Sequence, residues 1–152
     1  MDLVKEAIQV TLKTVEGSPE EWLNPSDGIL TRFVNENKNL RAQIDLELNE
    51  EPIFEFCSQE SYSLITSKRV ISIRNAVYNE KIIMEIDNVR PLIPDDYFEN
   101  PKPKKMLRII DFKKDEFLIE FDKGVPLYFA DILLTNLVWQ LQKGKWFLNP
   151  SK

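Results

Sequence analysis

The residue types that carry out most enzymatic chemistry are scarce in this chain. The 152-residue sequence has no histidine and a single cysteine, Cys57. Without histidine there is no imidazole base, no Ser-His or Cys-His nucleophile pair and no ordinary zinc site. Activation of Cys57 would require a neighbouring Lys, Arg or helix N-terminus, so an inert, partly buried thiol is the simpler interpretation.

Paired carboxylates are the remaining candidates for catalysis, and they occur at Glu20-Glu21, Glu50-Glu51 and Asp95-Asp96. Adjacent residues on a strand point to opposite faces, whereas hydrolysis needs carboxylates that converge from separate segments. Asp95 and Asp96 with Glu99 could offer oxygen ligands to a cation, but the twelve-residue calcium-loop pattern is absent. The sequence therefore predicts a protein that is not an enzyme and has no catalytic, cofactor-binding or metal-binding residues.

A weak basic patch consists of Lys102, Lys104, Lys105 and Arg108. It is interrupted by a proline, and no aromatic residues that could stack on bases accompany it, so a solvated face is the simpler interpretation. The net charge is −5 and the isoelectric point is near 4.9. Both values disfavour general binding to nucleic acid or to anionic membranes. We expect neither nucleic-acid binding nor stable membrane association.

Charge is unevenly distributed along the chain. Residues 1–60 carry 5 basic and 13 acidic side chains, and residues 61–152 carry 15 basic and 12 acidic ones. The two halves either neutralise each other within one fold or present an acidic surface to a basic partner. A single cysteine, no apolar run of about 20 residues and no secretory leader predict a cytoplasmic protein.

Hydrophobic periodicity defines the expected elements. Residues 2–15 have the apolar stripe of an amphipathic helix, and a short second helix is expected to begin at Ser18-Pro19. From about Leu40 the period changes to two, which is typical of strands joined by hairpins. A four-proline loop is expected at 88–104 and a closing helix at about 130–143. The expected strands are 44–48, 52–57, 61–66, 69–74, 80–87, 105–111, 116–122 and 125–129.

This order of elements, strands followed by one C-terminal helix, is similar to that of pleckstrin-homology-type domains. The segment Tyr62-Ser-Leu-Ile-Thr-Ser-Lys-Arg-Val-Ile-Ser-Ile-Arg74 resembles a pattern of bacterial pleckstrin-homology-like (PH-like) families, Tyr-x-Leu-Thr-x-x-Arg-hydrophobic-hydrophobic, with one extra residue, Ile65. The resemblance covers about residues 50–143. It implies a mainly β, α+β fold: a bent antiparallel sheet or PH-like barrel closed by the C-terminal helix.

Phosphoinositide-binding members of this fold carry a basic cluster between their first two strands. The corresponding segment here, Ser58-Gln59-Glu60-Ser61, has one acid and no base, so lipid binding is not carried over. We expect residues 1–49 to form an N-terminal helical extension with a first strand, and residues 50–152 to form the PH-like barrel. Together they would make a single compact unit.

A candidate partner surface lies at the C-terminus and comprises Ile132, Trp139, Trp146 and Phe147. On a helical wheel Ile132 and Trp139 fall on the polar side of the last helix, together with Asn136. Tryptophan is a frequent anchor of protein interfaces. We expect the N-terminal helix, from this chain or from a dimer mate, to pack against or near this side, because burial of two apolar surfaces is favourable.

These observations predict a non-catalytic module that binds a protein, a peptide or a second copy of the chain. One alternative is a small acidic immunity-type or inhibitor protein that masks a basic partner. Another is an enzyme that uses only carboxylates and lysines. A cleft with converging carboxylates would favour the enzyme, and a flat acidic patch from residues 45–60 would favour the inhibitor.

Overall fold

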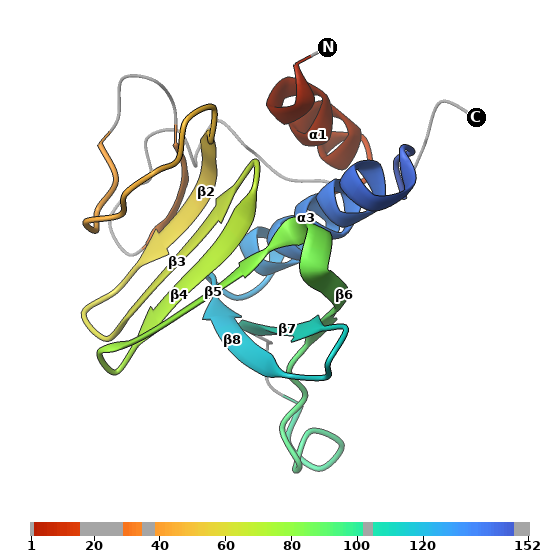
Figure 1. Ribbon diagram of the computed structural model, residues 1–152. Coiled ribbons are helices and arrows are strands. Elements are labelled where there is room, and N and C mark those ends of the chain that lie inside the picture. Colours follow the sequence, from red (N-terminus) through yellow and green to blue (C-terminus); the bar gives the residue numbers. More distant parts are fainter. Residues whose placement is uncertain (1, 16–28, 35–38, 102–104, 148–152) are drawn as a thin grey trace.

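The computed structural model describes residues 2–15, 29–34, 39–101 and 105–147 (Figure 1). The helix expected at Ser18 lies outside these residues. The protein is mainly β, with one helix at each end of the described chain. Its elements are α1 (Leu3–Leu12), β1 (Thr31–Phe33), β2 (Pro52–Cys57), β3 (Ser61–Thr66), β4 (Arg69–Arg74), β5 (Val77–Ile82), the 3-10 helix η1 (Ile83–Glu85), β6 (Ile86–Pro91), β7 (Met106–Asp111), β8 (Glu116–Glu120) and α3 (Val125–Lys143).

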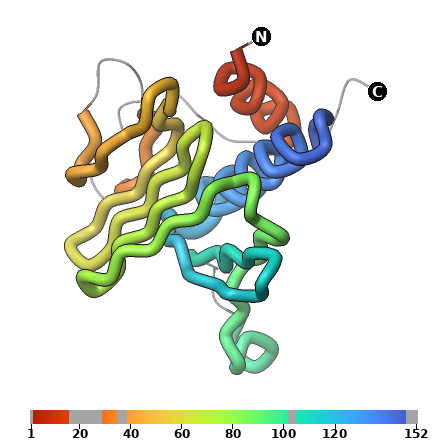
Figure 2. Tube along the Cα trace, viewed as in Figure 1, coloured from red at the N-terminus to blue at the C-terminus, as the bar shows by residue number. Residues whose placement is uncertain are grey.

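The strands form two antiparallel sheets of five and three strands, in the orders β1-β2-β3-β4-β5 and β6-β7-β8. Figure 2 shows the smaller sheet below the end of the larger one, with α3 passing behind the larger sheet and above the smaller one. No strand belongs to both sheets, so the described residues do not form the closed barrel that the resemblance implies.

Serine side chains join the two sheets where a backbone ladder is missing. The Ser72 hydroxyl donates to the Leu118 carbonyl over 2.6 Å, and the Glu120 N–H donates to Ser63 Oγ over 2.9 Å. Ser61 Oγ also donates to the Glu120 carboxylate, at 2.8 Å. These three serines are buried, so their hydroxyls satisfy polar groups that would otherwise be costly to bury.

The main core lies between the two sheets and α3. At its centre Phe54 stacks on Phe121 at 5.1 Å and contacts Phe129 at 5.3 Å between ring centroids. All three rings are fully buried and come from β2, from the residue after β8 and from α3. One aromatic cluster therefore ties both sheets to the closing helix.

Residues 39–51, here called the strap, cover the other face of the larger sheet. Leu40, Ala42 and Ile44 of the strap pack on a buried apolar cluster that includes Tyr62 and Leu64. Both faces of the central strands are consequently covered, and all six residues of β3 are buried. Burial on both faces explains why the period-two pattern is weak in β3.

The N-terminal helix packs against α3 of the same chain. Ala7 and Thr11 on α1 are fully buried, and Asn136 Nδ2 on α3 donates to Thr11 Oγ1 over 3.2 Å. In Figure 1 α1 lies beside the C-terminal half of α3. The helix α1 therefore packs on α3, at the side that carries the buried Asn136, whereas Ile132 and Trp139, where this contact was expected, line a separate hollow with no described α1 residue in its lining. No helix in the described part of the chain is long and apolar enough to cross a membrane.

Two expected strands are wrong. Residues 44–48 form no strand, because the strap crosses the sheet and Arg69 binds the Asp45 carbonyl. Residues 125–129 form the first turns of α3, where Pro126 suits the helix N-terminus after Gly124 at a φ of 91°. Their β-branched and aromatic composition favours a strand locally, but packing of Phe129 into the core overrides that preference.

The expected strand 80–87 is two strands separated by η1. Ile83 and Ile86, at either end of η1, are both fully buried. The chain therefore turns from one sheet to the other at this point. The strand β6 also extends four residues into the expected 88–104 loop and ends at Pro91, which an edge strand tolerates.

Overpacking the α1–α3 contact should destabilise the protein. Ala7→Leu places extra volume where the side chain is fully buried, so we expect the free energy of unfolding to fall by about 1–3 kcal/mol. Gln9→Leu, on the exposed side of the same helix, should change it by no more than about 0.5 kcal/mol. Urea denaturation of both variants measures the difference, and equal effects would contradict the α1 packing.

Candidate functional site

A surface hollow of about 310 Å³ lies between α3 and the start of β6 and is here called the α3–β6 hollow. Its apolar lining includes three of the four residues in the predicted partner surface, Ile132, Trp139 and Phe147. Asp87, Asn88, Val89, Asp131, Thr135 and Val138 complete the lining. The structure therefore brings these residues of the C-terminal region together with a strand that is far away in the sequence.

The aromatic wall of the α3–β6 hollow has a defined geometry. The rings of Trp139 and Phe147 are tilted by 49° with centroids 5.0 Å apart, and Lys143 Nζ lies 3.6 Å from the Trp139 ring centroid. The cation–π contact helps to fix the tryptophan ring. Trp146, the fourth predicted residue, is partly buried against the main core instead. Phe147 is 44% exposed, so this wall remains accessible.

Within the described part of the chain, the β6 strand pairs with β7 alone and so presents an unpaired edge beside this hollow. The Leu92 N–H donates to the Met106 carbonyl, so Leu92 and Met106 form a hydrogen-bonded pair. Counting back by two along the register, the main chains of Arg90 and Asn88 also face β7. Antiparallel ladders alternate, so the main chain of Val89 points outward. Val89 also lines the hollow, which places an outward N–H and C=O next to an apolar depression.

The junction between η1 and β6 is fixed to α3. Gln142 Nε2 donates to the carbonyls of Ile83 and Ile86, at 3.0 and 2.7 Å. The Ile83 carbonyl also accepts from the Ile86 N–H, so the side-chain amide is its second donor, and the same amide supplies a donor to the Ile86 carbonyl. The helix and strand that border the hollow are thereby held at a fixed separation at one end.

The other residues considered for binding or catalysis do not gather at one place in the structure. Lys102 and Lys104 lie outside the described residues, Lys105 is 4.0 Å from Glu120, and Arg108 is paired with Glu116 at 2.7 Å. Cys57 is partly buried and packs against the apolar cluster of Tyr62 and Leu64 that the strap covers. Within the described residues no group of three or more His, Cys, Asp or Glu side chains is arranged to hold a metal ion.

Glu55, on β2, is the main polar residue that sequence reasoning missed. Its side chain has no solvent exposure and lies 2.5 Å from Arg32 Nε and 2.9 Å from Arg41 Nε. The Tyr62 hydroxyl donates to Glu55 Oε2 over 2.6 Å. Burial, and then this hydrogen bond, raise the pKa of Tyr62 well above its usual value. The carboxylate therefore fastens β1, the strap and β3 to β2.

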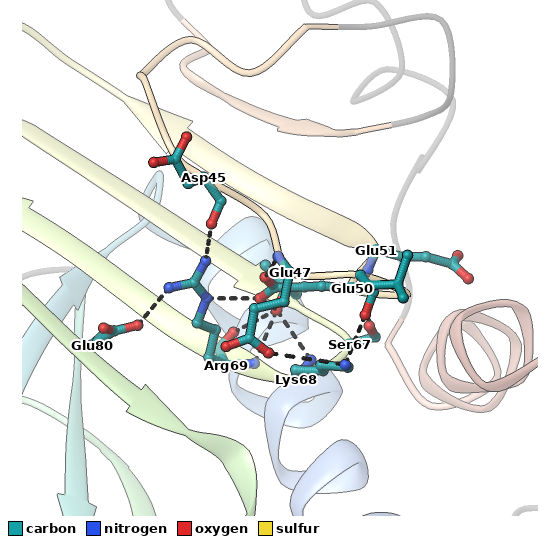
Figure 3. A network of polar contacts seen from close by, with 10 residues as sticks. Asp45, Glu47, Glu50, Glu51, Ser67, Lys68, Arg69 and Glu80 are labelled. Carbon is teal, nitrogen blue, oxygen red and sulfur yellow. Dashed lines mark hydrogen bonds and ion pairs between the residues drawn. The ribbon is translucent and has the colours of Figure 1, made fainter.

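A second buried carboxylate, Glu50, anchors the other end of the strap (Figure 3). Arg69 Nε donates to it over 2.8 Å, and Thr66 Oγ1 donates over 2.6 Å. Burial alone would raise the pKa of Glu50, but hydrogen bonds from Arg69, Thr66 and the Glu47 N–H hold it below its ordinary value of 4.5. Arg69 also binds Glu80 and the Asp45 carbonyl, so it joins the strap to β4 and β5.

A signal for both carboxylates is present in the sequence. Glu55 stands in the middle of the apolar run Ile53-Phe54-Glu55-Phe56, where a charged residue must find a partner if both strand faces are covered. The two arginines that meet it precede Glu55 itself by 14 and 23 residues, and no local rule connects them with it. Two of the acidic side chains of residues 1–60, Glu50 and Glu55, are thus buried and paired inside the fold.

Neutralising Glu55 should be strongly destabilising. Glu55→Gln leaves Arg32 and Arg41 without their carboxylate, so we expect the free energy of unfolding to fall by about 3 kcal/mol or more. Glu51→Gln, which changes an exposed carboxylate in the strap, should have an effect within about 0.5 kcal/mol. Denaturant titrations of the two variants provide the comparison, and a mild Glu55→Gln phenotype would argue against a structural role.

Glu50 should contribute to acid sensitivity. Because its folded pKa lies below the ordinary 4.5, its stabilisation is present above pH 4.5 and is lost as the pH falls through the folded value. The wild-type free energy of unfolding should therefore decrease more steeply between about pH 5 and pH 3 than that of Glu50→Gln. Thermal melts across this range measure both slopes, and parallel slopes would contradict the assignment.

Comparisons of the chain with protein-family models, with curated proteins and with solved structures found no match. The candidate site is therefore defined by its own geometry: an apolar hollow with an aromatic wall, bordered by the open edge of a strand.

Proposed function

We propose that this protein is a non-catalytic binding module that holds an extended peptide segment of a partner protein in the α3–β6 hollow. The observation that carries the proposal is the combination of an apolar depression and an outward strand edge in one place. An added strand can exchange main-chain hydrogen bonds with β6 while one apolar side chain enters the depression. Main-chain bonds then supply affinity, and the depression supplies selectivity.

The dimensions of the site suit this kind of ligand. About 310 Å³ is at the lower end of the size range of ligand pockets, enough for a large side chain but small for a substrate with several functional groups. Its walls carry tryptophan, phenylalanine and isoleucine, which are the residue types that make strong contacts at interface centres. Among the described residues, the lining of the hollow holds two aspartates, Asp87 and Asp131, but no lysine, cysteine or histidine.

An inhibitor that presents an acidic patch has less support. Of the acids in residues 45–60, Glu50 and Glu55 are buried against arginines, and Glu47 lies 3.9 Å from Lys68. These pairs reduce the acidic surface available to a basic partner. An enzyme based on carboxylates has less support still. Two carboxylates from separate segments, Asp87 and Asp131, line the α3–β6 hollow, but Asp87 is paired with Lys114 at 2.6 Å.

A PH-like ancestry of the fold is part of the proposal. Support comes from the four strands β2–β5, followed by the three strands β6–β8 and then by a closing helix. The motif segment 62–74 falls on the β3–β4 hairpin. We also infer a cytoplasmic setting, because one free cysteine in 152 residues fits a reducing compartment.

The proposal is tested with peptides selected from a displayed random library on the full-length chain. Binding of a selected peptide should weaken at least tenfold in Phe147→Ala, which removes part of the aromatic wall, and in Val89→Pro, which removes the outward N–H of β6. Peptide entry should also change Trp139 emission. Fluorescence polarisation measures the affinities.

The matched control is Phe112→Ala, an equally drastic truncation of an exposed phenylalanine in the turn between β7 and β8. Its affinity should stay within about twofold of wild type, because surface residues outside an interface are nearly neutral. Failure to select any peptide, or selected peptides that bind all three variants equally, would overturn the proposal.

A further inference from the structure

The β5 strand forms an edge of the larger sheet and is unusually open. It pairs only with β4, and five of its six residues are exposed. Val77, Tyr78 and Ile82 are 58%, 47% and 50% exposed, respectively. Natural proteins normally protect such an edge with charges, prolines or a covering segment. A long exposed edge with three large apolar side chains therefore requires an explanation.

The register defines which main-chain groups point away from the sheet. The Ile83 N–H donates to the Lys68 carbonyl, which continues the β4–β5 ladder in which Lys81 faces Val70 and Asn79 faces Ser72. Because hydrogen-bonded and non-hydrogen-bonded pairs alternate, the main chains of Tyr78, Glu80 and Ile82 point outward. The free edge thus offers the N–H groups of all three residues and the C=O groups of Tyr78 and Glu80, while the Ile82 C=O accepts the first hydrogen bond of η1.

The two charges on β5 do not protect this edge, because both are already paired within the chain. Glu80 accepts a hydrogen bond from Arg69 Nη1 at 2.6 Å, and Lys81 Nζ binds Asp111 at 2.9 Å. Figure 3 shows Glu80 turned toward Arg69, on the side where the strap carries Asp45. The usual gatekeeping effect of charged residues on an edge strand is therefore weakened.

We propose that β5 pairs in antiparallel fashion with β5 of a second copy of this chain, about a two-fold axis at Glu80. In this register Tyr78 lies opposite Ile82 of the second copy, and Ile82 lies opposite its Tyr78. The N–H groups of Glu80 and Ile82 in each strand then meet the free carbonyls of Glu80 and Tyr78 in the other strand. The two larger sheets become one continuous ten-stranded sheet.

The side chains favour this register over a shifted one. It pairs an aromatic with a β-branched residue twice, which is a favourable cross-strand combination. The two Glu80 carboxylates meet at the axis, and each is paired with its own Arg69, which also binds the buried Glu50. The inference does not depend on the peptide-binding function.

Sedimentation equilibrium of the full-length protein between 1 and 300 μM tests the proposal. We expect a concentration-dependent dimer that Ile82→Pro abolishes. Ile82 has a φ of −67°, which the proline ring adopts without strain, and its N–H is not used in the β4 ladder. Ile82→Ala removes the same side chain but keeps the N–H, so it should weaken the dimer less than Ile82→Pro does.

Circular dichroism at low concentration should give both variants the wild-type fold. A wild-type chain that is monomeric up to 300 μM, or an Ile82→Pro variant that still forms the same dimer, would overturn the proposal.

Disulfide trapping tests the register directly. In a Cys57→Ser background, Glu80→Cys should form a dimer-linking disulfide under mild oxidation, because opposite residues at the axis have a Cα separation of about 5.5 Å. Asn79→Cys lies opposite Lys81 of the second copy and should not crosslink efficiently. Efficient crosslinking at position 79 with none at position 80 would overturn the register.

Discussion

The burial of the Glu55 carboxylate is the constraint on which the rest of the structure depends. A charge without solvent exposure in the middle of an apolar strand is tolerated only when it is fully paired and hydrogen-bonded. Arg32, Arg41 and Tyr62 supply these partners from β1, the strap and β3. One side chain on β2 thereby determines where a short edge strand begins and where the covering segment crosses the sheet.

The strap is attached at both ends by the same kind of chemistry. Glu50 and Arg69 repeat at the β3–β4 turn what Glu55 and its arginines do near β1. Between these anchors the strap contributes only a few apolar side chains to a small cluster. Its path is therefore specified more by directional polar contacts than by hydrophobic area, which explains why it needs no strand ladder of its own.

Much of the fold could be predicted from the sequence, for local reasons. The hairpins β2–β3–β4 follow from alternating residues and turn formers, and the two terminal helices follow from their apolar stripes. The split of 80–87 and the coil at 44–48 could not be predicted, because both depend on contacts made across the sheet. For the candidate site, the pattern identified Ile132, Trp139 and Phe147 as a surface. The β6 edge beside them depends on the tertiary arrangement of distant segments.

The separation of the strands into two sheets has a consequence for valency. A closed barrel would hide its edges, whereas here β5 and β6 follow each other in the chain, are joined by the three residues of η1 and have one free edge each. Association at β5 would place two α3–β6 hollows in one assembly. Such a bivalent assembly would bind a partner that carries repeated segments with an avidity far above the affinity of either hollow, provided that the spacing of the segments spans both.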